Sequence, residues 1–331
     1  MKKIELPFKL IFSFCIIFAL SLIAAFRGST FDTENYIDIF NNIDWQLGPV
    51  SIWNEYHIEY GFIIYNGLIK FLSQGDIKAY FFISSFIPLY LFYKSADILQ
   101  VNPVESLIIL SGSYFPLLYL IQMRQGLAIA LSIYAVCSYY KKRSIAPFFT
   151  IGLIAFTIHI SSSIFLICGF LYPLYERRWR GISGYLKILF LSLILSSLVI
   201  YLFRNSGFEK FNYYVENYDE AGDLLSITNI KYYVLFAISL LVYKSRPSNN
   251  LRFLLYFITL NVGFRVGLYE IFVLSGRLTS IFSVMEIFVL PLIFKNLKIN
   301  FWCGLIIIIL YSIISLYYLL FIKYTHIIEL Y

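Results

Sequence analysis

The sequence predicts an all-α, polytopic integral membrane protein, and its composition is the main reason. Hydrophobic residues make up 60% of the 331 residues, charged residues only 14%, and the mean hydropathy is +0.76. Soluble proteins are about 45–50% apolar and about 25% charged, so this chain has too few polar groups to cover a surface that faces water. The composition excludes a soluble enzyme, and no segment is long and polar enough to form a separate soluble domain.

Apolar segments separated by short polar loops predict the transmembrane helices. A helix needs about 20 apolar residues to cross a bilayer, and fewer where its polar ends reach the interface. We predict 11 crossings, within a range of about 10–12, in a single domain over residues 1–331. The predicted spans are 8–26, 78–93, 105–121, 124–140, 145–158, 160–174, 184–203, 230–243, 251–265, 278–294 and 301–321. Lysines precede the first span and no small-residue cleavage site follows it, so we expect a retained signal anchor.

Clusters of lysine and arginine orient these spans, because basic residues accumulate in cytoplasmic loops. Such clusters lie at 2–9, 141–143, 177–180, 244–252 and 295–298. All of them share the inner side only if the short apolar segment 61–73, which contains Lys70, does not cross the membrane. We therefore predict an interfacial or re-entrant helix at 61–73, with the N-terminus in the cytoplasm and the C-terminus outside. The net charge of +7 reflects this orientation, and we expect no nucleic-acid partner.

Two longer extracytoplasmic loops, 27–60 and 204–228, carry most of the 19 acidic residues. In the first loop, Asp32, Tyr36 and Phe40 recur every four residues, which predicts a helix that lies on the membrane interface. Aromatic rings beside carboxylates also suit sugars, although aromatic residues are common at membrane interfaces without any ligand. The second loop is an acidic cover to which we assign no chemistry.

Arginines at the outer ends of spans are the most informative charged residues. The arginines in question are Arg27, Arg124, Arg204, Arg265 and Arg277. One alternative is that each reaches up to lipid phosphates or pairs with a loop carboxylate, which lowers the cost of placing an arginine near the membrane. However, several on the translocated side suggest a common ligand. A guanidinium binds phosphate through two parallel hydrogen bonds, so the group favours a lipid-linked phosphate or pyrophosphate.

Arg124 opens a predicted helix whose small residues, Gly126 and Ala128 among them, allow close helix packing. At a helix N-terminus, its guanidinium, Gln125, free backbone N–H groups and the positive end of the helix dipole together favour an anion. The alternative is a structural Arg–Glu pair between helices, with Glu59 or Glu286 as the acid.

His159 lies between two short apolar runs that both return to basic inner loops, so it is predicted to lie at the tip of a hairpin that ends outside or part-way into the membrane. A lone histidine is usually structural, but this position also suits proton transfer. Glu286 is an acid deep within a predicted span and needs a partner or a proton. It would pair with Arg124 or Arg265, or take part in an ion pathway, and it is the main support for a transporter.

The landmarks together resemble the EpsG-type branch of the Wzy-like polysaccharide polymerases. The matching residues run from Arg27, Asp32 and Tyr36 through Glu59-Tyr60-Gly61-Phe62 and Arg124-Gln125-Gly126-Leu127-Ala128 to Lys141-Lys142, His159, Ser161 and Ser275-Gly276-Arg277. Tyr60 stands where a proline is common, and Ile158 where a phenylalanine often precedes the histidine. Both departures leave the charged positions intact.

The resemblance implies a bacterial inner-membrane glycosyltransferase with a GT-C-like architecture that serves capsule, exopolysaccharide or O-antigen assembly. Such an enzyme transfers a growing glycan from undecaprenyl pyrophosphate onto the next lipid-linked repeat unit at the outer face of the membrane. Its partners would be the lipid-linked oligosaccharide, membrane lipids, a chain-length regulator and a flippase.

For this reaction we predict catalytic roles for Arg124 and Arg277, which would stabilise the leaving pyrophosphate, and for His159, which would accept the hydroxyl proton. Asp32 and Glu59 are the alternative proton acceptors. The predicted substrate-binding residues are Arg27, Asp32, Tyr36, Glu59, Gln125 and Arg265. Pyrophosphate leaves readily and the sequence has no DxD motif, so we expect neither a metal ion nor another cofactor.

Two other functions remain open at this stage. A transporter, such as a flippase of lipid-linked oligosaccharide, often has internal repeats with interrupted helices, and we find no convincing repeat. A ligase that moves finished glycan onto another acceptor would use the same donor and leaving group, so the sequence does not separate it from a polymerase.

Overall fold

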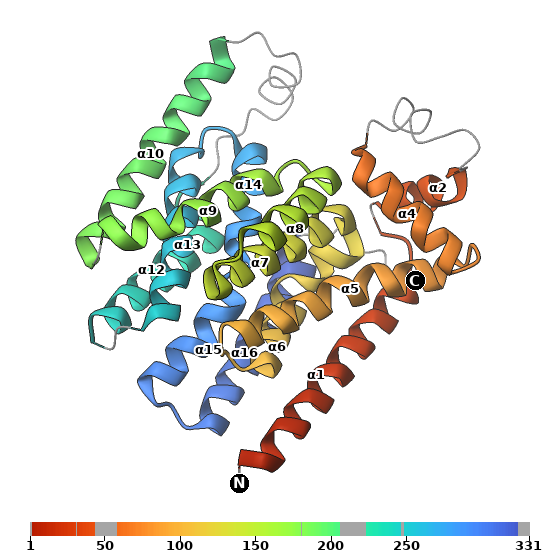
Figure 1. Ribbon diagram of the computed structural model, residues 1–331, viewed down its shortest axis with the longest axis horizontal. Coiled ribbons are helices and arrows are strands. Elements are labelled where there is room, and N and C mark those ends of the chain that lie inside the picture. Colours follow the sequence, from red (N-terminus) through yellow and green to blue (C-terminus); the bar gives the residue numbers. More distant parts are fainter. Residues whose placement is uncertain are drawn as a thin grey trace. The chain divides into compact units, whose positions relative to one another are not determined.

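The computed structural model describes residues 2–30, 32–43, 58–179, 181–205, 223–245 and 248–323. These residues are mostly helical and form no strand among them, which confirms the all-α fold class (Figure 1). The chain divides into two compact units. Unit 1 comprises Met1–Leu166 and Asn300–Tyr331, and unit 2 comprises Ile167–Ile299.

The chain forms most of unit 1 first, then unit 2, and its last two helices belong to unit 1 again. Unit 1 contains α1 (Lys2–Ala25), α2 (Thr33–Asn42), α4 (Tyr60–Leu72), α5 (Ile77–Ile98), α6 (Pro103–Ser113), the π-helix η1 (Pro116–Ile121), α7 (Met123–Lys142), α8 (Ile145–Ile158), α16 (Phe301–Tyr318) and the π-helix η2 (Leu319–Lys323). Helix α9 (Ser162–Arg178) begins at the end of unit 1. Unit 2 continues with α10 (Ile182–Asn205), α12 (Ile227–Ser245), α13 (Asn249–Gly267), α14 (Phe272–Ser283) and α15 (Glu286–Leu297).

Every predicted span falls on a helix, but two of the spans are interrupted. The span 105–121 divides into α6 and η1, where Pro116 lacks the backbone N–H that a continuous helix needs. The span 278–294 divides into α14 and α15 at Val284 and Met285, without a proline or glycine at the break. The segment 61–73 forms α4, and whether it crosses the membrane stays a prediction.

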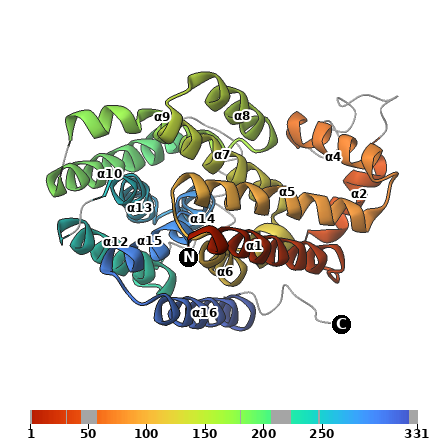
Figure 2. The ribbon, with the colours of Figure 1, turned by 60° about the horizontal axis from the view of Figure 1, so that its bottom comes forward.

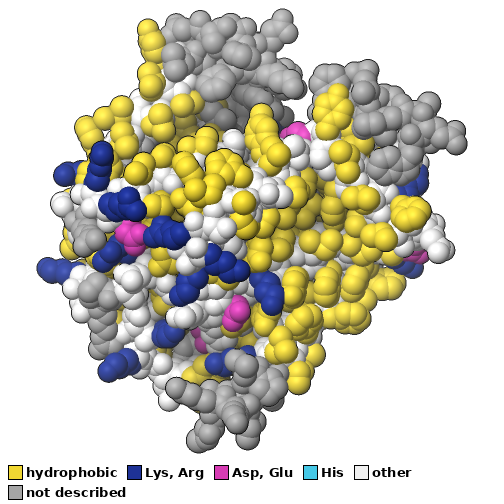
Figure 3. Space-filling view, viewed as in Figure 1, with side chains coloured by type: hydrophobic (Ala, Val, Ile, Leu, Met, Phe, Trp, Pro, Cys, Tyr) yellow, Lys and Arg dark blue, Asp and Glu magenta, His cyan; other side chains and the backbone are white. Residues whose placement is uncertain are grey.

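Three helical stretches of the described residues are long and apolar enough to cross a membrane: Ile182–Tyr201, Ser275–Leu297 and Phe301–Ile322. Only 17% of the most apolar part of Phe301–Ile322 is buried, so this helix exposes apolar side chains around most of its surface. Hydrophobic side chains also cover much of the face shown in Figure 3. Apolar surface of this extent is typical of a membrane protein.

The helix predicted in the first outer loop exists, and its buried side faces α4 and α5. Tyr36 and Phe40 of α2 are buried, and the Phe40 ring stacks on Tyr80 of α5 at 4.4 Å between ring centroids. Figures 1 and 2 both show α2 and α4 beside each other at one end of α5. These aromatic contacts fix α2 to the other helices of unit 1.

The contacts of Lys70 account for a lysine near the end of the apolar helix α4. Its ammonium group donates hydrogen bonds to the backbone carbonyls of Asn41 at 2.7 Å and Ile43 at 2.9 Å. These carbonyls lie at the C-terminus of α2, where helix carbonyls lack partners and a cation is favourable. The contact ties the last turn of α4 to the last turn of α2.

Candidate functional site

Three helix ends in unit 1 bring Glu59, Arg124 and His159 together. Glu59 is the residue before α4, Arg124 is the second residue of α7, and His159 follows the last residue of α8. The first turn of α4 lies close against the last turn of α8, because a Cβ atom on Gly61 would collide with Thr157. This close approach places the Glu59 carboxylate beside His159.

The Glu59 carboxylate bridges the arginine and the histidine. Arg124 Nη1 donates to Glu59 Oε2 at 2.8 Å, and His159 Nδ1 lies 3.0 Å from Glu59 Oε1. The side chains of Arg124, Glu59 and His159 are 28%, 26% and 15% exposed, so a ligand can reach all three groups. Sequence analysis named each of the three residues separately. The contact with Glu59 is the Arg–Glu pair that it gave as the alternative to an anion site at Arg124.

The contacts with Arg124 and His159 lower the pKa of the Glu59 carboxyl group. Burial raises the pKa of Glu59, but the hydrogen bond with His159 and the charge of Arg124 outweigh burial and lower the pKa from 4.5 to about 2. A carboxylate with so low a pKa is ionised at neutral pH and is a weak base. Glu59 is therefore suited to orient its two neighbours, and not to accept a proton from a substrate.

The ionised carboxylate also sets the tautomer of His159. Since a carboxylate can only accept hydrogen bonds, Nδ1 of His159 carries the proton in this contact, and in the neutral ring Nε2 is then the basic nitrogen. A carboxylate that orients an imidazole in this way is a recurrent arrangement in general base catalysis. The geometry favours His159 over Glu59 as the proton acceptor.

The pH dependence of stability follows from the Glu59 pKa. Because the pKa is lower in the folded chain than the usual 4.5, the ion pairs of Glu59 contribute stability fully above about pH 4.5 and lose it as pH falls toward 2. We expect the thermal unfolding midpoint to drop between pH 5 and pH 3 by more in the wild-type chain than in Glu59→Gln. Parallel curves for the two proteins would contradict this assignment.

Tyr36 supports Arg124 from α2. The backbone N–H of Arg124 donates to the Tyr36 hydroxyl at 3.4 Å, and the Tyr36 ring meets Phe62 of α4 edge-on at 6.0 Å. Burial, with a further contribution from Asp32, raises the Tyr36 pKa to about 12, so the hydroxyl stays protonated. Gln125 is buried, with 6% of its surface exposed.

Gly126 holds the start of α7 close to the end of η1, because an added Cβ atom would meet the Leu118 carbonyl oxygen and, at 3.0 Å, Tyr119. Alanine normally stabilises a helix relative to glycine by about 1 kcal/mol, but this contact reverses the sign. We expect Gly126→Ala to destabilise the chain by about 1–3 kcal/mol, measured as a lower thermal unfolding midpoint. Gly28→Ala is the matched control, since nothing lies within 4 Å of a Cβ atom there. Equal midpoints for both variants would contradict the role of Gly126.

Arg27 has a more structural environment than the sequence indicated. Its Nη1 donates to the carbonyls of Tyr119 at 2.9 Å and Leu120 at 3.2 Å, and its guanidinium stacks 3.6 Å from the Phe81 ring centroid. Burial lowers the Arg27 pKa to about 10, against the opposing effects of Tyr80, Tyr36 and Asp32. Arg27 therefore joins the end of α1 to the end of η1, where carbonyl groups favour a cation.

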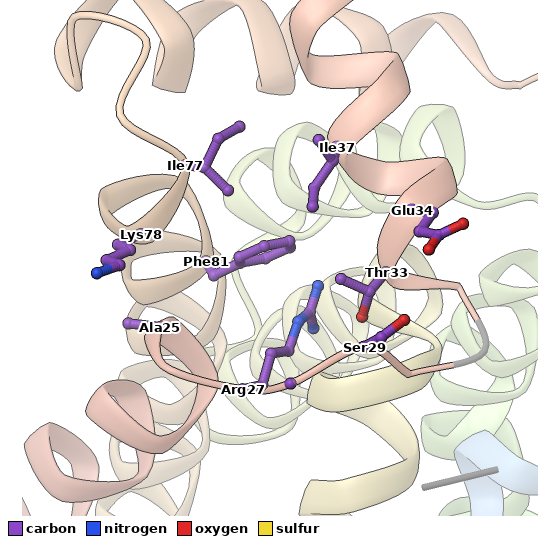
Figure 4. Close-up of a pocket in the computed structure, with 10 residues that line it drawn as sticks. Ala25, Arg27, Ser29, Thr33, Glu34, Ile37, Ile77, Lys78 and Phe81 are labelled. Carbon is purple, nitrogen blue, oxygen red and sulfur yellow. The ribbon is translucent and has the colours of Figure 1, made fainter. Parts of the chain in front are cut away.

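A pocket of about 340 Å³ opens beside Arg27. Figure 4 shows the guanidinium between Phe81 and Thr33, while the Lys78 ammonium points away from the pocket. Arg27 Nε and Nη2 are buried and make no hydrogen bond with the described residues. Asp32, at the start of α2, is half-buried.

The remaining predicted arginines, at positions 204, 265 and 277, belong to unit 2. Arg265 of α13 donates hydrogen bonds to Asn261, Asn229 and Ser283. Arg277 of α14 is exposed. The Arg204 side chain lies outside the described residues, as do residues 206–222 of the predicted acidic loop.

Glu286 corrects one prediction. The sequence suggested Arg124 or Arg265 as its partner, but Glu286 Oε2 lies 2.8 Å from the Lys231 ammonium. Glu286 starts α15 and is buried, and Lys231 approaches it from α12. Sequence reasoning missed Lys231 because a lysine near the start of a span is usually taken to reach the interface.

Comparison with known proteins supports the resemblance noted above. The model of the EpsG family matches residues 10–331, nearly the whole chain. No curated protein and no solved structure matches the chain. At a general level, the family match indicates a Wzy-like polysaccharide polymerase, a membrane protein with glycosyltransferase-like activity on a lipid-linked oligosaccharide.

Proposed function

Because the chain belongs to the EpsG family, we propose that it polymerises repeat units carried on undecaprenyl pyrophosphate at the outer face of the bacterial inner membrane. The growing glycan moves from its lipid carrier onto the next lipid-linked unit, in capsule, exopolysaccharide or O-antigen synthesis. The observation that carries this proposal is the bridge from Arg124 through Glu59 to His159 in unit 1.

The bridge supplies the two groups that the transfer needs. An acceptor hydroxyl oxygen forms a bond to the anomeric carbon of the donor glycan, while the bond from that carbon to the pyrophosphate oxygen breaks and its electron pair leaves with the pyrophosphate. The hydroxyl proton passes to Nε2 of His159, whose ring Glu59 holds in place. The Arg124 guanidinium stabilises the negative charge that develops on the leaving group.

The other predicted residues have secondary roles in this proposal. Tyr36 and Gln125 flank Arg124, and Arg27 and Asp32 would contact substrate from the end of α1 and the start of α2. The role predicted for Arg277, stabilising the leaving pyrophosphate, stays a separate proposal. Charge on the pyrophosphate is neutralised by guanidinium groups in this scheme, so we propose that the reaction proceeds without a metal ion.

The leaflet on which lipid-linked units accumulate separates this proposal from a flippase. Cells that lack this chain are expected to accumulate single lipid-linked units on the outer leaflet, where a membrane-impermeant label or glycosidase reaches them. A flippase lesion would retain the units on the inner leaflet, so protected units would contradict the proposal. Short units on the outer leaflet, without polymer, also separate it from a ligase, whose loss would leave long lipid-linked glycan.

A further inference from the structure

The helical stretch that carries Arg124 is broken just before this residue. The π-helix η1 ends at Ile121, Gln122 has a non-helical backbone conformation (φ −99°, ψ 54°), and α7 begins at Met123. In a continuous α-helix the N–H group of each residue donates to the carbonyl four residues earlier, so Arg124 would donate to Leu120. The break removes this hydrogen bond and leaves one carbonyl and one N–H group that need other partners.

The segment between α1 and α2 supplies the donors for the Leu120 carbonyl. The Thr30 hydroxyl donates to this carbonyl oxygen at 2.5 Å, and Arg27 Nη1 donates to it at 3.2 Å. Thr30 is buried, with 8% of its surface exposed, so water has little access to compete for the carbonyl. The Thr30 hydroxyl therefore takes the acceptor that the Arg124 N–H group would use in a continuous helix.

Thr33, the first residue of α2, orients the Thr30 hydroxyl. The two hydroxyl oxygens lie 2.6 Å apart, and the Thr30 backbone N–H donates to Thr33 Oγ1 at 3.1 Å. A hydroxyl group has one hydrogen, and Thr30 uses its hydrogen on the Leu120 carbonyl, so Thr33 is the donor between the two hydroxyls. The hydrogen bonds therefore run in one direction, from Thr33 through Thr30 to Leu120, and each bond polarises the next.

Tyr36 of α2 supplies the acceptor for the Arg124 N–H group. Its hydroxyl accepts this hydrogen bond at 3.4 Å, in place of the Leu120 carbonyl. Tyr36 is buried, and its ring packs edge-on against Phe62 of α4, so the hydroxyl is held in position. Thr30 and Tyr36 together replace both partners of the one helical hydrogen bond that the break removes. Both residues belong to the segment that follows α1.

We propose that Thr30 is a positioning residue for Arg124: it keeps the helix broken at this point, so that Arg124 stays in the first turn of α7 with its guanidinium 2.8 Å from Glu59. Without the Thr30 hydroxyl, the Leu120 carbonyl loses the nearer of its two donors and accepts from the Arg124 N–H group. The guanidinium then moves with the backbone, away from the Glu59 carboxylate. The effect on turnover rests on the proposed function, whereas the effect on the contact between Arg124 and Glu59 does not.

Thr30→Val tests this role, because valine has nearly the shape of threonine but lacks the hydroxyl. Turnover is measured with the purified full-length chain in liposomes and the cognate lipid-linked repeat unit as substrate. We expect kcat to fall about 3–10-fold, the size of one hydrogen bond, with little change in KM. The kcat falls because Arg124 acts on charge that develops only in the transition state. Thr30→Ser keeps the hydroxyl and should retain most of the wild-type kcat.

Acid unfolding gives a second measurement, which does not depend on activity. Glu59 faces Arg124 and His159, and these contacts contribute stability that is lost as the pH falls. If Arg124 moves away in Thr30→Val, the pKa of Glu59 rises toward its usual 4.5. The thermal unfolding midpoint should then drop less between about pH 5 and pH 3 than it does in the wild-type chain.

The matched control is Thr150→Val on α8, where an exposed hydroxyl donates to the Ala146 carbonyl of its own helix. This variant should equal the wild-type chain in both measurements. An unchanged acid response of Thr30→Val, or an unchanged kcat in an active chain, would overturn the positioning role and leave the proposed polymerase intact. A weakened acid response would support the placement of Arg124 even if the wild-type chain made no polymer. Should Thr30→Val not fold, Thr33→Val removes the donor to Thr30 and should show the same two changes.

Discussion

Arg124→Ala is expected to abolish polymer while single lipid-linked units persist. Arg124 is the only guanidinium in the bridge with Glu59 and His159, and its side chain is 28% exposed. Removing a group that stabilises developing charge costs about 10²–10³ in rate, which is enough to prevent long chains from forming. The products are compared on gels of extracted lipid-linked glycan, at matched protein levels.

Two further variants test whether the loss of polymer is specific to the Arg124 guanidinium. Lys141→Ala removes a cation from the exposed last turn of the same helix and should leave polymer length normal. Arg124→Lys retains a charge beside Glu59 but loses the planar fork that binds phosphate, so we expect short chains in low amounts. Normal chain length in Arg124→Ala, with unchanged protein levels, would rule out the proposed role of this arginine.

His159 variants are expected to lose turnover while they retain lipid binding. Loss of a general base typically lowers the rate by about 10²–10⁴, whereas the proposed contact of Arg124 with phosphate does not involve the imidazole. His159→Ala should therefore show a much lower turnover of lipid-linked units and a nearly unchanged affinity for undecaprenyl diphosphate, both measured with purified enzyme.

His159→Asn separates the catalytic role from a structural one. An asparagine N–H₂ group can replace Nδ1–H as donor to Glu59, but asparagine has no basic nitrogen in place of Nε2. If the histidine only supports the hairpin tip, His159→Asn will retain most of the activity that His159→Ala loses. Equal losses of turnover in both variants, at unchanged affinity, agree with a general base. A parallel loss of turnover and binding in His159→Ala would make the histidine structural.

Local patterns in the sequence predicted the positions of the site residues but not their pairing. The four-residue spacing of Asp32, Tyr36 and Phe40 predicted α2, and the apolar run 124–140 predicted the helix that begins near Arg124. The two short apolar runs around His159 predicted the turn between α8 and α9.

The partners of the charged residues depend on tertiary packing, which leaves little trace in a single sequence. Glu59 and Glu286 were both considered as partners for Arg124, and the structure pairs Arg124 with Glu59. Glu286 pairs with Lys231 just after a helix break at 284–285, which no proline or glycine indicates. Asn261 was not singled out from the sequence, although it lies four residues before Arg265 on α13 and residues at that spacing share a helix face.

Reconstitution tests the central claim most directly. Purified chain is placed in liposomes with the cognate repeat unit on undecaprenyl pyrophosphate, and both glycan products and released carrier are measured over time. The account predicts a ladder of polymer, one carrier released for each glycosidic bond, and no ladder from Arg124→Ala or His159→Asn. A folded wild-type chain that forms no ladder, or variants that form one as fast as wild type, would contradict it.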